Sequence, residues 1–106
     1  MNRVYKKAYF NLYQFDNEYI IHNTRKEFQE GHTHIKNYKT AVFIIDLALH
    51  KSIPHHLYPY LLESLRRITD DKEYATKIES LLEIKNNKSK QYYFNSNKGV
   101  RKKRRS

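Results

Sequence analysis

Residues 9–21 decide the fold class of this 106-residue chain, and they read YFNLYQFDNEYII. Two aromatic-rich strands joined by a turn at Asp16-Asn17 would give this pattern. A helix would give it as well, because apolar side chains recur at helical spacing from Tyr5 to Tyr13. We favour the helix. The predicted fold class is therefore all-α, a compact helical bundle in which residues 5–28 form a helix or, as the alternative, a hairpin.

Residues from Asn37 onward carry the strongest helical pattern of the chain. Apolar side chains occupy one helical face and most of the remaining positions, which is typical of a helix at the centre of a domain. The side chains on that face are Tyr38, Ala41, Val42, Ile45 and Leu49. A buried strand over Val42 to Ile45 is the alternative, but the pattern is longer than a strand requires. We therefore predict a central helix.

Two further helices are expected up to residue 85. Ser52-Ile53-Pro54 ends the first helix and begins the second, since Ser caps helices and Pro fits a first turn. Asp70 and Glu73 have the spacing of a capping box for the third. The apolar stripes of these two helices are Leu57, Leu61, Leu62, Leu65 and Ile68, then Tyr74, Ile78, Leu81 and Leu82. Because the connections are short, residues 37–85 are predicted to form a compact three-helix unit.

Gly31 is one of two glycines in the chain. It is placed to end the N-terminal helix after Phe28-Gln29-Glu30, because glycine adopts the left-handed conformation of a helix C-terminus without strain. Residues 32–36 would then be a linker. The segment from Asn86 is polar and poor in aliphatic side chains, so we expect it to be disordered when free. The predicted organisation is one small helical domain over residues 1–85 and a basic tail over residues 86–106.

Positive charge is concentrated at the C-terminal end. Residues 85–106 hold nine Lys and Arg and no Asp or Glu, while residues 1–84 hold twelve basic and eleven acidic side chains. The formal charge of +10 is thus +9 in the last 22 residues and +1 in the rest. A polycation joined to a nearly neutral body suits a protein that is held on phosphates by one part and does something else with the other.

The tail supplies the predicted nucleic-acid-binding residues. Its Lys and Arg side chains would contact phosphates, and the aromatic side chains among them would stack on bases. The predicted set is Lys88, Lys90, Tyr92, Tyr93, Lys98, Arg101, Lys102, Lys103, Arg104 and Arg105. Arg66 and Arg67 are predicted secondary phosphate contacts, although ordinary intrahelical pairing with Glu63 explains them about equally well.

The predicted function is a small nucleic-acid-associated accessory or regulatory protein that binds phosphates through its basic tail. The alternative is a protein-interaction module, such as a phage or mobile-element product that modulates host machinery, with a tail that gives only electrostatic attraction. Ten tyrosines favour this alternative, because tyrosine is a common anchor in interfaces. The partner is thus nucleic acid of unspecified type or a host protein, and the sequence does not define the oligomeric state.

Catalytic and metal-binding motifs are missing from the sequence. Two glycines cannot build a P-loop or a dinucleotide fingerprint, so we expect neither an enzyme nor a cofactor. The six histidines lack metalloprotease spacing, and we expect no metal site. In this interpretation His32 and His34 lie in a loop, and His55 and His56 in a first helical turn. Asp46 and His50 are four residues apart on an apolar helix, and we interpret them as a structural pair.

Composition also indicates the compartment. The chain has no cysteine, no apolar stretch near 18 residues and no apolar segment of the secretory type at its start. We therefore expect a cytoplasmic protein that does not engage a membrane. Lys, Asn, Ile and Tyr, whose codons are A/T-rich, make up 42 residues. This composition indicates a low-GC bacterium, or a phage or mobile element within one.

Overall fold

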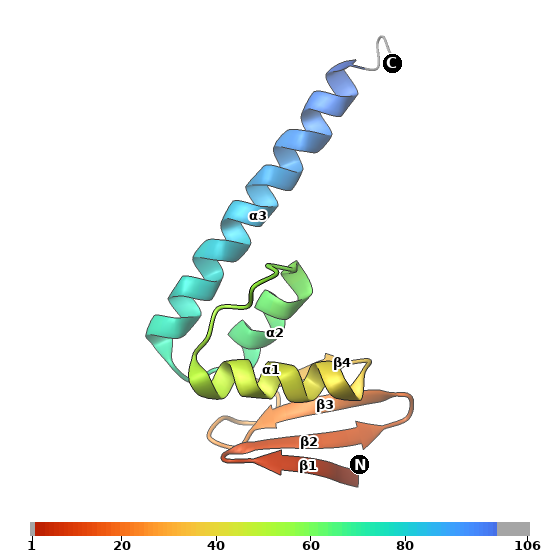
Figure 1. Cartoon of the computed structure of the whole chain (residues 1–106), viewed down its shortest axis with the longest axis vertical. Helices are drawn as coiled ribbons and strands as arrows, with labels where there is room; N and C mark the ends of the chain where they lie inside the picture. Colours follow the sequence, from red (N-terminus) through yellow and green to blue (C-terminus); the bar gives the residue numbers. More distant parts are fainter. Residues whose placement is uncertain (1, 100–106) are drawn as a thin grey trace.

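A computed structural model describes the backbone of residues 2–99 and the side chains of residues 2–85. Four strands come first: β1 (Asn2–Lys7), β2 (Phe10–Phe15), β3 (Glu18–Asn23) and β4 (His32–Ile35). Three helices follow: α1 (Tyr38–His50), α2 (Pro59–Ile68) and α3 (Lys72–Gly99). The strands pair in sequence order into one antiparallel sheet (Figure 1). The prediction of an all-α helical bundle is therefore wrong, because the chain combines a sheet layer with a helical layer.

The N-terminal segments form strands because alternate side chains meet different surroundings. In β2, Phe10 and Leu12 are buried in the core shared with the helices. The adjacent Tyr13 projects from the opposite face of the sheet, and Ala8 lies in a turn. The helical spacing from Tyr5 to Tyr13 thus combines side chains that point in opposite directions. It is a coincidence of composition, and the hairpin alternative is the structure that forms.

The β1–β2 and β2–β3 hairpins close through two-residue turns, Ala8-Tyr9 and Asp16-Asn17. The first residue of each turn is left-handed, with φ 54° at Ala8 and 54° at Asp16. Hairpin turns of this length need a positive φ, which aspartate tolerates better than alanine. This is why the second turn can be identified in the sequence and the first cannot.

Helix α1 confirms the prediction of a helix after Asn37. The Asn37 side chain caps it, since Oδ1 accepts a hydrogen bond from the Thr40 amide at 3.1 Å. The buried side chains of α1 face the sheet and α2. They are Ala41, Ile44, Ile45 and Ala48.

The other two helices begin later than predicted. Helix α2 begins at Pro59, so Ser52-Ile53-Pro54 lies in a loop. Helix α3 is capped by Asp71 rather than Asp70, because Asp71 Oδ1 accepts the Tyr74 amide hydrogen at 2.9 Å. This hydrogen bond is the main cause that lowers the pKa of Asp71, and the nearby Lys51 lowers it further. Burial raises the pKa of Tyr74 to about 12, and its hydroxyl donates to the Ser52 carbonyl at 2.6 Å.

Gly31 does not end a helix. It lies directly before β4, and its carbonyl accepts the Asn23 amide hydrogen at 2.9 Å. A Cβ atom at this position would stand 2.6 Å from Lys26 Cβ, so the close approach of the chain requires glycine. The segment predicted as a linker, residues 32–36, mostly forms β4.

The core lies between the sheet and the helices. Helices α1 and α2 both contact β3 and β4, and α1 crosses in front of the sheet in Figure 1. Helix α3 packs against α2 and then extends beyond the rest of the molecule (Figure 1). It continues to Gly99, so the backbone of residues 86–99 is helical where the sequence predicts disorder. Within the described part of the chain, no helix is long and apolar enough to cross a bilayer.

Candidate nucleic-acid interface

The strand register divides the side chains of the sheet between two faces. Ladder partners share a face, so Tyr5, Leu12, Ile21 and Thr33 form one row across the four strands. This row lies on the inner face, where Thr33 Oγ1 bonds Ser64 of α2 at 3.2 Å. The rows on either side of it lie on the opposite face, which we call the outer face. They are Lys6, Asn11, His22 and His32, and Arg3, Tyr13, Ile20 and His34.

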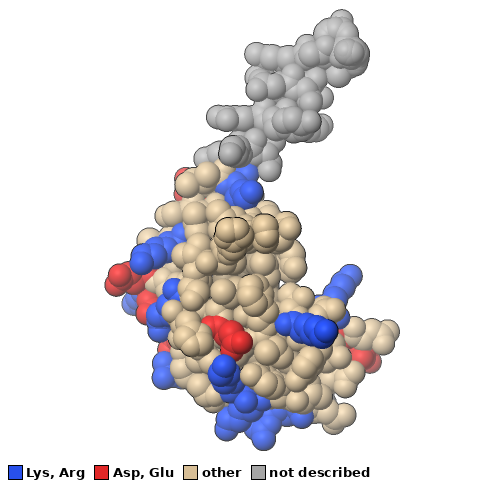
Figure 2. Space-filling view, in the orientation of Figure 1, with Lys and Arg blue, Asp and Glu red and all other residues tan. Residues whose placement is uncertain are grey.

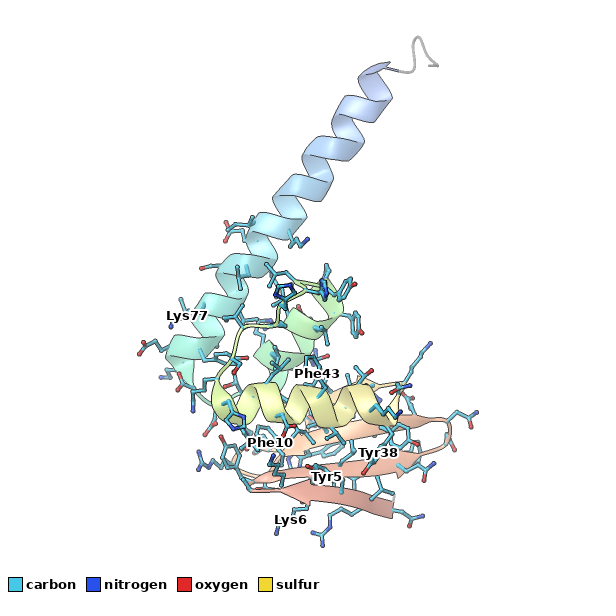
Figure 3. The ribbon with its side chains drawn as sticks, in the orientation of Figure 1. Tyr5, Lys6, Phe10, Tyr38, Phe43 and Lys77 are labelled. Carbon is cyan, nitrogen blue, oxygen red and sulfur yellow. The ribbon has the colours of Figure 1, made fainter. Side chains whose placement is uncertain are left out.

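Each outer row begins with a cation on β1 and ends with a histidine on β4. Lys6 and Arg3 are exposed, and neither has an ion pair within the described residues. Lys6 points away from the helices, while Phe10 lies close to α1 (Figure 3). At the other end, His34 Nδ1 lies 3.2 Å from Glu18 Oε1. The outer face thus presents positive charge at its β1 side.

Strand β1 is an edge of the sheet. Figure 2 shows Lys and Arg side chains gathered at the lower end of the molecule, where β1 lies in Figure 1. Lysines on an edge strand also discourage pairing with other chains, so these cations have a structural use besides any ligand contact.

Most ion pairs of the body join cations to acids on other elements. They are Lys7 with Asp46 at 2.7 Å, Arg25 with Asp70 at 3.3 Å and Lys51 with Asp71 at 3.4 Å. Arg66 instead pairs with Glu63 within α2. These pairs engage four of the twelve Lys and Arg in residues 1–84.

The two predicted secondary phosphate contacts are both engaged by the body. Arg66 pairs with Glu63, the intrahelical partner that the sequence offered as the alternative. Arg67 Nε donates to the His32 carbonyl at 3.3 Å and remains exposed. The structure places both on α2, and of the two only Arg67 reaches the sheet, through the backbone of His32.

The predicted tail residues lie beyond the described side chains. Lys88, Lys90, Tyr92, Tyr93 and Lys98 belong to the backbone of α3, but their side chains are outside the described part. Five further predicted residues lie wholly outside the described part of the chain: Arg101, Lys102, Lys103, Arg104 and Arg105.

The histidines occupy different elements from those expected. His32 and His34 lie on β4 rather than in a loop, and His55 and His56 lie in the loop before α2 rather than in a helical turn. Among the described residues, no group of three or more His, Asp or Glu is arranged to hold a metal ion.

Asp46 and His50 do not pair through their side chains. The Asp46 carboxylate binds Lys7 and raises the pKa of that lysine. His50 Nδ1 instead lies 2.9 Å from the backbone carbonyl of Asp46.

A hollow of about 370 Å³ lies beside the N-terminus of α1. It is lined by His34, Ile35, Lys36, Asn37, Thr40 and Tyr60. The Thr40 amide already donates to Asn37, so it is not available to an anion.

Sequence reasoning did not identify the outer face. The available signal was the period of two in β2, where the polar groups of Asn11 and Tyr13 alternate with the apolar side chains of Phe10 and Leu12. Comparison with protein-family models, curated proteins and solved structures gives no match.

Proposed function

We propose that the protein binds nucleic acid by neutralising phosphates with its basic C-terminal segment, as a small accessory or regulatory factor. One observation carries the proposal: residues 85–106 hold nine cations and no acid, against twelve and eleven in the rest of the chain. Lys and Arg that neutralise phosphates release condensed counterions, which supplies affinity without sequence preference. The absence of cysteine from the sequence fits action in the cytoplasm.

The ion pairs of the body support this division. Lys7, Arg25, Lys51 and Arg66 each have a carboxylate partner, and residues 1–84 carry a net charge of only +1 (twelve basic, eleven acidic), so most of the attraction for phosphates comes from the basic segment. Helix α3 connects the body directly to the basic segment, since its backbone runs without interruption from Lys72 to Gly99.

Fluorescence anisotropy with labelled 12-nucleotide single strands and 12-base-pair duplexes tests the proposal. Log affinity should fall linearly with log salt, with a slope of about −0.9 per neutralised phosphate on duplex and about −0.7 on single strands. Replacing Arg101, Lys102, Lys103, Arg104 and Arg105 by Ala should weaken binding to all sequences alike and flatten the slope, because phosphate contacts carry no base information.

The matched control replaces four exposed lysines of the body, Lys36, Lys39, Lys72 and Lys77, by Ala. This variant should keep most of the affinity and slope. No binding near physiological salt, or equal losses in both variants, would contradict the role of the basic segment.

A second candidate function is a protein-interaction module. Exposed aromatic rings on the helical side favour it: His56 and Tyr58 centroids lie 5.8 Å apart, and Tyr58 and Tyr60 centroids 6.3 Å apart. Tyr58 and Tyr60 are 53% and 57% exposed, and such rings are common interface anchors. In a pull-down from bacterial lysate, a partner protein that persists after nuclease treatment and is lost on Tyr58→Ala with Tyr60→Ala would support this function.

A further inference from the structure

Helices α1 and α2 cover the inner face of the sheet, and no described helix covers the outer face. Within the described residues, the hydrogen bonds from sheet side chains to the helices lie on the inner face, as between Lys7 and Asp46 and between Asn23 and Ile68. Yet the outer face is not uniformly polar, because Ile20 is 4% exposed and Tyr13 half-buried beside it. The outer face thus combines the apolar Ile20 and Tyr13 at its centre with cations at its β1 side and aromatic rings at its β4 side. This combination is suited to a ligand that has both flat rings and negative charge.

The aromatic side of the outer face is built from neighbouring rings. Phe28, in the loop before β4, stacks on His32 with centroids 4.5 Å apart and planes 9° apart. His22 lies 5.2 Å from Phe28, and His34 lies 5.1 Å from His32. Phe28 is 37% exposed, so this group of rings is accessible to a further stacking partner.

Two of these rings are held in place by backbone carbonyls. His32 Nδ1 lies 2.6 Å from the Phe28 carbonyl, and His22 Nε2 lies 3.0 Å from the Lys26 carbonyl. A carbonyl oxygen can only accept, so each ring nitrogen carries the proton and donates. The rings are therefore oriented before any ligand arrives, which lowers the entropy lost on binding.

Asn11 is a second, independent indication of a ligand. It lies between Lys6 and His22 in its row, is 8% exposed, and donates from Nδ2 to the Tyr13 hydroxyl at 3.1 Å. Its Oδ1 is buried and has no partner in the described part of the chain. Buried acceptors are normally satisfied, so this atom lacks the donor that its burial calls for.

We propose that the outer face binds single-stranded nucleic acid, with bases stacked on the rings of Phe28, His32 and Tyr13 and phosphates held by Lys6 and Arg3. This inference rests on the proposed function and adds to it the class of nucleic acid. Four strands at about 4.8 Å spacing span about 14 Å. A four-stranded RNA-binding sheet with aromatic side chains on its open face stacks two or three bases. Paired bases of a duplex cannot lie flat on such a surface. DNA and RNA single strands share the chemistry, and both are assayed.

The experiment measures the affinity of the full chain for dT12, U12 and a 12-base-pair DNA duplex by anisotropy. The test variant is Phe28→Leu with His32→Gln, which keeps side-chain size and removes both rings. Loss of one stacked base should weaken dT12 or U12 binding about 5- to 150-fold and leave duplex binding within about twofold. The matched control, Tyr58→Leu with Tyr60→Gln, removes two exposed rings from the helical side and should change neither.

Failure of this inference differs from failure of the proposed function. In one outcome, wild type binds all three probes, the Arg101–Arg105 alanine variant binds none, and Phe28→Leu with His32→Gln binds with wild-type affinity. The outer face is then not the binding site, but the proposed function stands. If wild type binds none of the probes, the function itself is contradicted. A partner protein that survives nuclease and is lost in the Phe28 and His32 variant would overturn the inference by assigning the face to a protein.

A second measurement does not depend on variant stability. Ultraviolet cross-linking of wild type to 4-thiouridine-labelled U12, followed by mass spectrometry, should label peptides that contain Tyr13, Phe28 or His32. Cross-links confined to residues 85–106 would overturn the inference.

Discussion

The two faces of the sheet are made by the same strands and differ in almost every property. On the inner face, Leu12 and Ile21 are fully buried against the helices. On the outer face lie Lys6, Tyr13 and His22, and among the described residues none of these three side chains bonds to a helix. Alternation along a strand thus separates two roles, stability on one face and ligand contact on the other. Substitutions on the two faces should therefore have different consequences.

The largest difference in stability is expected between Leu12→Ala and Phe28→Ala. Leu12 is 0% exposed, so its truncation leaves a cavity and should lower the free energy of unfolding by about 2–5 kcal/mol. Phe28 is 37% exposed beside the outer face, and its truncation should lower this free energy by less than about 1 kcal/mol. Urea denaturation followed by circular dichroism measures both. Similar losses would show that the outer face is also structural.

An intermediate difference is expected between the two buried asparagines. Asn23 on the inner face donates to the Ile68 carbonyl at 2.8 Å and accepts from the Arg25 amide at 2.8 Å. Asn23→Ala leaves that carbonyl without its donor and should lower the free energy of unfolding by about 1–3 kcal/mol. Asn11→Ala on the outer face also removes an unpartnered acceptor and should lower it by less than about 1 kcal/mol. The same urea experiment applies, and a larger loss for Asn11 would reverse the comparison.

The smallest difference concerns adjacent lysines on β1. Lys7 pairs with Asp46, and the hydrogen bond and charge of Asp46 raise its pKa above the usual 10.5. The folded state thus favours the charged lysine, so the stabilisation is complete below the unfolded pKa and disappears as pH rises through the folded pKa. Lys7→Ala should lower the melting temperature slightly at pH 7 and no longer once the pH exceeds the raised pKa of Lys7, and high salt should reduce the effect.

Lys6→Ala is the control for that experiment, because Lys6 has no ion pair within the described residues. It should leave the melting temperature unchanged at both pH values. An equal pH dependence in the two variants would contradict the assignment of Lys7 to the inner face and Lys6 to the outer face.

The helical layer could be predicted from the sequence better than the sheet. The helical period of α1 is long enough to outweigh the strand alternative over Val42 to Ile45. Each strand instead has six residues or fewer, and the aromatic side chains of residues 9–21 fit two periods. The turn at Ala8 lacks a recognisable signal, and Pro54 and Pro59 offer two starts for α2. The basic tail could be identified from the sequence because its charged residues are consecutive along the chain. The outer face could not, because its residues come from four strands and become neighbours only when the sheet forms.

Selective ¹³C-methyl labelling of isoleucine tests the central claim most directly, because Ile20 and Ile21 are adjacent on β3 and lie on opposite faces. The full chain is titrated with dT12 and the methyl resonances are followed by NMR. Bases stacked over the outer face should shift the Ile20 methyl resonances through ring currents, while Ile21 and Ile45 in the core stay in place. If dT12 binds but the Ile20 resonances do not move, or move no more than those of Ile21, the outer face is not where nucleic acid binds.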